Sequence, residues 1–119
     1  MTLKECYALF EGDYDDVIAR LGSETLVKRF VFKFLDDSSY DTLLKSLEAE
    51  DYKEAFRAAH TIKGICQNLS FTKLFESSNR LTDALRPEEK CDVTDLIEQV
   101  KNDYEQTSSA IKALKAENA

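Results

Sequence analysis

The chain of 119 residues contains no tryptophan, one proline, one methionine, one histidine and three glycines. Proteins with many β-turns need glycine and proline at those turns, so this scarcity argues against an all-β fold. A hydrophobic fraction of 43% and a charged fraction of 33% are typical of a helical bundle. The length suits a single domain with one core, which we expect to cover residues 1–119.

Long apolar runs and an excess of basic residues are also missing. No segment approaches the ~20 consecutive apolar residues that a transmembrane helix needs, and the N-terminus lacks the basic start and apolar core of a signal peptide. The net charge of −7 argues against nucleic-acid binding, because contact with phosphates requires a basic surface. We therefore expect a cytoplasmic protein that binds neither membrane nor nucleic acid, and the charged surface favours a monomer.

Cysteines and glycines are too few and too scattered for several kinds of site. Cys6, Cys66 and Cys91 are odd in number, form no CxxC pair and are accompanied by one histidine, which argues against a zinc site and against a disulfide framework. With glycines only at positions 12, 22 and 64, no glycine-rich loop can hold nucleotide phosphates. We expect no metal, no cofactor of its own, and no kinase or ATPase activity.

Apolar residues recur at helical spacing, and capping residues divide the pattern into segments. Thr2 and Glu5 form a capping-box pair, Asp13 and Ser23 are N-cap residues, and Gly22 ends a segment. The expected helices cover residues 2–10, 14–21, 23–35, 39–49, 52–69, 71–86 and 92–117. The fold predicted from them is all-α: an up-and-down antiparallel four-helix bundle over residues 23–117, preceded by a short helical N-terminal arm over residues 1–22.

The segment 23–35 has a wide apolar stripe that we expect to be buried: Leu26, Val27, Phe30, Val31, Phe34 and Leu35.

The only histidine, His60, lies in the segment 52–69. At ~100° per residue, one side of this helix is formed by small and aliphatic residues that we expect to be buried: Ala55, Ala58, Ala59, Ile62, Ile65, Cys66 and Leu69. His60 lies on the opposite side and should face water. Six residues fall within ~60° of it on the helix surface: Lys53, Phe56, Arg57, Lys63, Gly64 and Gln67.

These features also have ordinary explanations. A single histidine on a helix is usually a surface residue, and Arg57 and Lys63 could belong to a solvated charged face. Gly64 is harder to explain in this way, because a glycine inside a helix costs ~1 kcal/mol relative to alanine. Its missing side chain leaves room for a large group to approach the imidazole.

A water-facing imidazole is a competent nucleophile at neutral pH, and with a phosphoryl donor it would form a phosphohistidine. Lys63, three residues further along, could reach the phosphoryl oxygens, and phosphoryl transfer depends mainly on positioning and charge stabilisation. The spacing of these side chains therefore suits phosphoryl transfer.

His60, Lys63, Gly64 and Leu69 resemble the HxxKGxxxxL signature of histidine-containing phosphotransfer (HPt) domains of bacterial phosphorelays, and the similarity extends from about residue 26 to residue 86. The resemblance implies that His60 accepts the phosphoryl group, that Lys63 helps to hold it and that Gly64 clears space beside the ring.

Two positions differ from the family pattern. Ser70 stands where the family usually has glycine, at the turn between two helices. Thr82 stands where some members have a glutamine that hydrogen-bonds the other nitrogen of the histidine ring, and a threonine has a shorter reach.

From this resemblance we expect a phosphorelay intermediate in which His60 exchanges a phosphoryl group with an aspartate of a response-regulator receiver domain. A sensor histidine kinase is the other expected partner, and Mg²⁺ is expected on the receiver. Phe56 could be an apolar anchor for the partner, surrounded by Lys53, Arg57 and Gln67, or it could lean into the edge of the core. The alternative function is an adaptor that only binds, including an HPt-like protein that has lost its chemistry.

Overall fold

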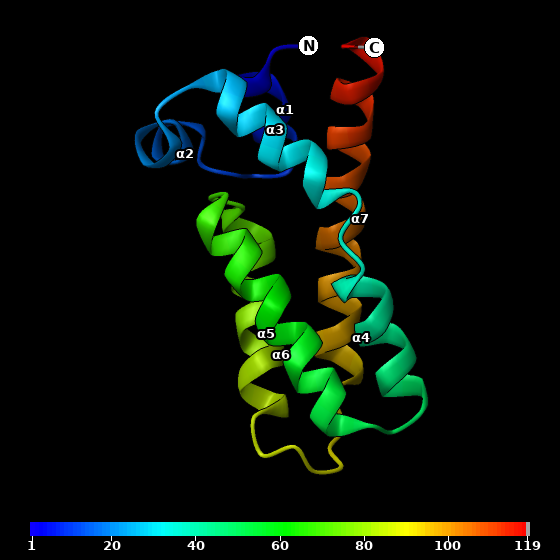
Figure 1. Ribbon diagram of the computed structural model, residues 1–119. Coiled ribbons are helices and arrows are strands. Elements are labelled where there is room, and N and C mark those ends of the chain that lie inside the picture. Colours follow the sequence, from blue (N-terminus) through cyan, green and yellow to red (C-terminus); the bar gives the residue numbers. More distant parts are fainter. Residues whose placement is uncertain (119) are drawn as a thin grey trace.

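The computed structural model describes residues 1–118, which form seven α-helices and no strand (Figure 1). The helices are α1 (Leu3–Leu9), α2 (Tyr14–Leu21), α3 (Glu24–Phe34), α4 (Ser39–Glu48), α5 (Tyr52–Asn68), α6 (Thr72–Leu85) and α7 (Thr94–Glu117). The all-α prediction is confirmed. Each expected helix is present, and the ends differ by only a few residues.

Local capping signals explain where the first helices begin and end. The side chain of Thr2 accepts a hydrogen bond from the backbone N–H of Glu5 and the Glu5 side chain accepts one from that of Thr2, which completes the predicted capping box. Asp13 and Ser23 cap α2 and α3 by each accepting one hydrogen bond from a backbone N–H, that of Asp16 and that of Leu26, and such a cap stabilises a helix by about 1 kcal/mol. Gly22 ends α2 with a φ of 89°, a left-handed conformation that favours glycine.

The longest helix, α7, runs along the whole molecule (Figure 1). Helices α1 and α3 contact α7, and α3 lies beside its C-terminal half. Helix α4 contacts α7 through the rings of Tyr40 and Tyr104, which stack with centroids 3.7 Å apart. Helix α5 packs between α4 and α6, and α6 in turn packs against α7. The arrangement is a helical bundle in which α3 and α4 follow one another along α7, with α1, α2 and α3 gathered at one end (Figure 1).

An aromatic cluster forms the core at the end that carries α1, α2 and α3. The ring of Phe71 lies 5.8 Å from that of Tyr7, 5.1 Å from that of Phe10 and 5.2 Å from that of Phe34, measured between centroids. Gly12 is required beside these rings, because a Cβ there would lie 2.7 Å from atoms of both Tyr7 and Phe10. Aromatic pairs in such geometries contribute ~0.5–1.5 kcal/mol each beyond the burial of their area.

The N-terminal helices are attached to the turn that follows α5. The buried Tyr7 hydroxyl donates a hydrogen bond to the carbonyl of Leu69 (2.8 Å), and the backbone N–H of Asp13 donates to the carbonyl of Ser70 (2.9 Å). Ser70 has a φ of 57°, a left-handed conformation that favours glycine. Its hydroxyl donates a hydrogen bond to the carboxylate of Asp16 (2.6 Å). This bond joins the turn to α2, which a glycine could not do.

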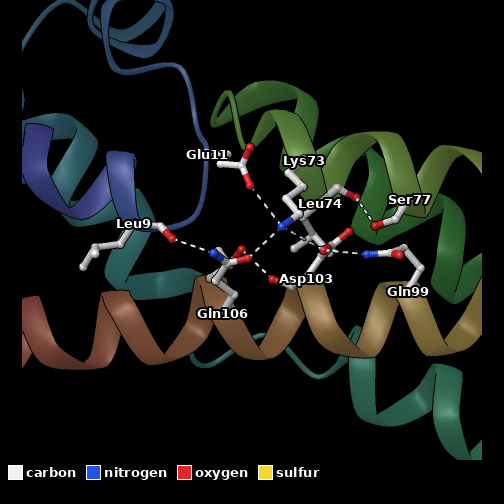
Figure 2. Close-up of polar contacts among 9 residues, drawn as sticks. Leu9, Glu11, Lys73, Leu74, Ser77, Gln99, Asp103 and Gln106 are labelled. Atoms are coloured by element: carbon white, nitrogen blue, oxygen red, sulfur yellow. Dashed lines mark hydrogen bonds and ion pairs between the residues drawn. The ribbon is translucent and has the colours of Figure 1, made fainter.

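A polar network also joins the N-terminal helices to α6 and α7 (Figure 2). The Lys73 ammonium lies 3.0 Å from the Glu11 carboxylate and 3.7 Å from that of Asp103, and donates a hydrogen bond to Gln106. Gln106 in turn donates to the carbonyl of Leu9. The hydrogen bond to Glu11 raises the pKa of Lys73. Asp103 is only 3% exposed, so Lys73 supplies the positive charge that a buried carboxylate needs.

Two residues that we expected to be buried line a surface hollow instead. Phe30 is 40% exposed and Ile65 is half-buried, and both border a hollow of about 610 Å³ between α2, α3 and the end of α5. The other face of α3 is buried through Val27, Val31 and Phe34. Since α3 packs mainly against α2 and α7, its buried stripe is narrower than the sequence predicted, and Phe30 falls outside it.

Candidate functional site

Helix α5 carries the predicted site and presents one side of itself to α4 and α6. The Asp51 side chain caps it by accepting a hydrogen bond from the backbone N–H of Glu54 (3.1 Å). Its buried residues are mostly small: Ala55, Ala58, Ala59, Ile62 and Cys66. Small side chains let neighbouring helices approach closely, so this helix is held firmly along its inner side.

His60 lies on the outer side of α5 and is exposed to water, as the helical periodicity predicted. Its ring is 5.9 Å from that of Phe56, between centroids, with an angle of 61° between the planes. The two rings line a shallow hollow together with Arg57 and Thr61. Within residues 1–118, His60 forms no hydrogen bond and no ion pair, so both ring nitrogens are available to a partner.

Gly64 and Lys63 lie one turn beyond His60 on the same helix. A Cβ placed on Gly64 would have no heavy atom within 4 Å, so the glycine is not required by packing inside the protein. Lys63 is half-buried and is not in an ion pair with any carboxylate of residues 1–118. The space beside the imidazole and a cation near it are therefore both present.

The expected docking residues differ in how close they lie to the imidazole. Phe56 is half-buried and Arg57 is exposed, and both line the hollow beside His60. The guanidinium of Arg57 is 3.9 Å from the carboxylate of Glu54, a long and exposed pair that leaves it free to turn to another anion. Lys53 and Gln67 are exposed and lie seven residues from His60 in either direction, roughly 10 Å along the helix axis.

Arg86, at the end of α6, also belongs to this surface, although the sequence analysis did not include it among the site residues. Its guanidinium carbon lies 5.6 Å from the centroid of the Phe56 ring, and its Nη2 atom donates a hydrogen bond to Asp83 (3.0 Å). Arg86 is 30 residues from Phe56 in sequence. Only the antiparallel packing of α5 and α6 brings the two together, and no sequence pattern signals that contact.

Thr82 forms no hydrogen bond with the imidazole in the described residues 1–118. It is fully buried, and its hydroxyl donates a hydrogen bond to the carbonyl of Ser78 (2.7 Å) within α6. The Thr82 hydroxyl is therefore not available to the second ring nitrogen of His60.

The arrangement combines an exposed imidazole, open space beside it and nearby cations on a firmly packed helix. A neutral imidazole nitrogen can attack an electrophilic phosphorus, and a lysine ammonium can stabilise charge on the phosphoryl oxygens. Among residues 1–118, no group of three or more histidine, cysteine or acidic side chains is placed to bind a metal ion. The imidazole and Lys63 can thus supply a nucleophile with electrostatic support.

The family model of the Hpt domain matches residues 7–110. The chain belongs to the Hpt domain family. Hpt domains are phosphotransfer carriers in phosphorelays, where they interact with histidine kinases and receiver domains, and they are not themselves kinases or ATPases. Comparisons with curated proteins and with solved structures found no match.

The match to the Hpt domain spans all of α2 to α6, the end of α1 and most of α7. It therefore includes the hollow beside His60 and both ends of the helix that carries it. Within residues 1–118 of this Hpt domain, no helix is sufficiently long and apolar to span a bilayer.

Proposed function

We propose that this Hpt domain is a phosphorelay intermediate in which His60 accepts a phosphoryl group from an aspartyl phosphate of a receiver domain and returns it in the reverse reaction. The observation that carries the proposal is the exposed imidazole beside the open space at Gly64. A histidine kept only for packing would be enclosed by its neighbours. A glycine that no neighbour requires would be expected to be alanine in a helix.

The transfer step follows from the chemistry of the two groups. A ring nitrogen of neutral His60, which we take to be Nε2, attacks the phosphorus in line, and an N–P bond forms. The P–O bond to the partner aspartate breaks, and its electron pair returns to the aspartate as a carboxylate. Lys63 stabilises negative charge on the equatorial oxygens, while the receiver supplies the aspartate and Mg²⁺.

The scaffold in this proposal is an up-and-down four-helix unit formed by α4, α5, α6 and α7, whereas the bundle expected over residues 23–117 also included α3. The contacts of α5 with α4 and α6, and of α6 with α7, support this assignment. A helix that is packed on one side limits the movement of its outer side chains, and transfer tolerates little misplacement of the nucleophile. The scaffold therefore contributes orientation.

The partner docks over the same surface in this proposal. Lys53, Arg57 and Lys63 give α5 a locally basic side on a chain with a net charge of −7. An acidic receiver site would be attracted to such a side, and Phe56 would supply an apolar contact at its centre. We further propose that the protein is cytoplasmic and monomeric, and light scattering tests the monomeric state. We also propose that its association with the receiver weakens as the salt concentration rises.

The experiment is incubation with a receiver domain labelled on its aspartate. Label on the protein should be labile to acid and stable to alkali, and His60→Gln should abolish it. Lys63→Ala should slow transfer about tenfold, or ~1.4 kcal/mol of transition-state stabilisation. The matched control is Lys112→Ala, which removes an exposed charge on α7 and should leave the rate unchanged.

Two results would contradict the proposal. Label that persists in His60→Gln would place the phosphoryl group elsewhere. Receivers that bind the protein but never label it would favour the adaptor function.

A further inference from the structure

A row of four side chains crosses from α6 to α5 and ends at the imidazole. Asp83 accepts a hydrogen bond from Arg86, and the Arg86 guanidinium lies over the Phe56 ring at 5.6 Å from its centroid. Phe56 in turn meets His60 in an edge arrangement at 5.9 Å. Each member of the row therefore contacts the next.

The direction of helical side chains makes Phe56 the residue that limits the imidazole. Side chains on a helix lean toward its N-terminus, so the ring of His60 lies over the turn that contains Phe56. On the other side of His60 lies the open space at Gly64. The Phe56 ring therefore borders the imidazole on its N-terminal side, in a hollow that Arg57 and Thr61 also line, and the position of this ring restricts the available orientations of the imidazole.

The Phe56 ring lies against Arg86. Phe56 is half-buried and has no polar group with which to fix its own ring. A guanidinium is planar and weakly hydrated, which suits it to lie against an aromatic face. The bond to Asp83 (3.0 Å) orients the guanidinium, although both side chains are exposed, and Pro87 follows directly, so α6 ends at this point.

We infer that Arg86 is a positioning residue for the phosphotransfer: it holds the Phe56 ring in place, and that ring restricts the orientations of the His60 imidazole. This inference rests on the proposed function. It assigns a role to a residue outside α5 that does not contact the reacting nitrogen. An ordinary surface ion pair between Arg86 and Asp83 would have no effect on the imidazole.

The test uses the whole chain and three variants: Arg86→Ala, Arg86→Lys and the control Lys112→Ala. The first measurement is made without any phosphoryl donor. It is the nuclear Overhauser effect between ring protons of Phe56 and His60, together with the chemical shifts of the His60 ring protons. In Arg86→Ala the Overhauser effect should fall to about half or less and the signals of the His60 ring protons should shift, because Arg86 no longer holds the Phe56 ring.

The second measurement is transfer from a labelled receiver at several receiver concentrations. Arg86→Ala should lower kcat about tenfold with KM within about twofold, because orientation is lost while docking is retained. Arg86→Lys keeps the charge without the planar contact and should give intermediate values of kcat and of the Overhauser effect. Lys112→Ala should match the unaltered protein, and all variants should unfold at the same temperature.

An Overhauser effect that is unchanged in Arg86→Ala overturns the inference, whatever happens to the rate. A raised KM with an unchanged kcat also overturns it, because Arg86 would then act in docking. Failure of the proposed function is seen separately, as an absence of label on the unaltered protein. In that case the role of Arg86 in transfer is refuted together with the proposed function. If the unaltered protein is labelled and kcat is unchanged in Arg86→Ala, only the role of Arg86 is refuted.

Discussion

Replacing Gly64 with alanine should change stability and phosphotransfer in opposite directions. Gly64 lies inside α5, and an added Cβ would meet no heavy atom within 4 Å. The substitution therefore carries no steric penalty, and alanine is favoured over glycine in a helix by ~1 kcal/mol. With an unfolding entropy of ~2.1 cal/mol/K per residue, this gain raises the Tm of a chain of this length by about 4 °C.

The same Cβ would enter the space into which the phosphoryl group must fit. A methyl group there should slow transfer to and from His60 about tenfold, because a small displacement of the reacting atoms has a large effect on rate. A longer side chain fills more of the space, so Gly64→Gln should slow transfer about a hundredfold. Glutamine is also a good helix former, so its Tm should still exceed that of the unaltered protein.

Thermal unfolding followed by circular dichroism and transfer from a labelled receiver measure the two effects. Asn102→Ala is the matched control, because Asn102 is exposed on α7 and its replacement raises helix propensity far from His60. It should raise the Tm and leave the transfer rate unchanged. A lower Tm in Gly64→Ala would show that the space is not open, and an unchanged rate in Gly64→Gln would refute the role of the glycine in phosphotransfer.

Three further predictions concern the attachment of the N-terminal helices and the thiols. Tyr7→Phe removes a buried hydrogen bond to the turn after α5 and should lower the free energy of unfolding by about 1–3 kcal/mol in urea titrations; an unchanged midpoint would contradict this. Hydrogen bonds from Ser70 and then Arg20 hold the pKa of Asp16 below its usual value of 3.8. The stability that Asp16 contributes is therefore fully present above pH 3.8 and is lost as the pH falls through the lower pKa of the folded state. In an acid titration, the free energy of unfolding of Asp16→Asn should therefore depend less on pH than that of the unaltered protein. Burial raises the pKa of the Cys6 thiol to about 11, and that of the other buried cysteine is raised further, so a thiol reagent should modify only Cys91 in the native protein and all three in denaturant.

The helices and the exposure of His60 could be predicted because the signals for them are local. Caps such as Thr2, Asp13 and Ser23 act within one helical turn, and the sequence alone shows them. Helical periodicity likewise places a residue on the inner or outer side of its own helix. It placed His60 on the outer side without any knowledge of the neighbouring helices.

The contacts between distant segments could not be predicted in this way. The exposure of Phe30 depends on which helices cover α3, and its own sequence pattern resembles that of a buried residue. The contact between Arg86 and Phe56 and the bond from Ser70 to Asp16 each join residues more than twenty positions apart. A charged residue at a helix end and a serine in a turn usually face solvent, so nothing in the sequence distinguishes these from ordinary surface residues.

These distant contacts explain how an exposed side chain can nonetheless be well positioned. Helix α5 is capped at its start by Asp51, packed along its inner side by small residues, and bound at its end by Tyr7 and Asp13 from the N-terminal helices. The backbone of His60 is therefore fixed in three ways, and only the side-chain dihedral angles of the imidazole remain free. The Phe56 ring limits those angles on one side, whereas the space at Gly64 leaves the other side open. It follows that substitutions around the ring should alter transfer without unfolding the protein, whereas substitutions at the ends of α5 should alter stability first.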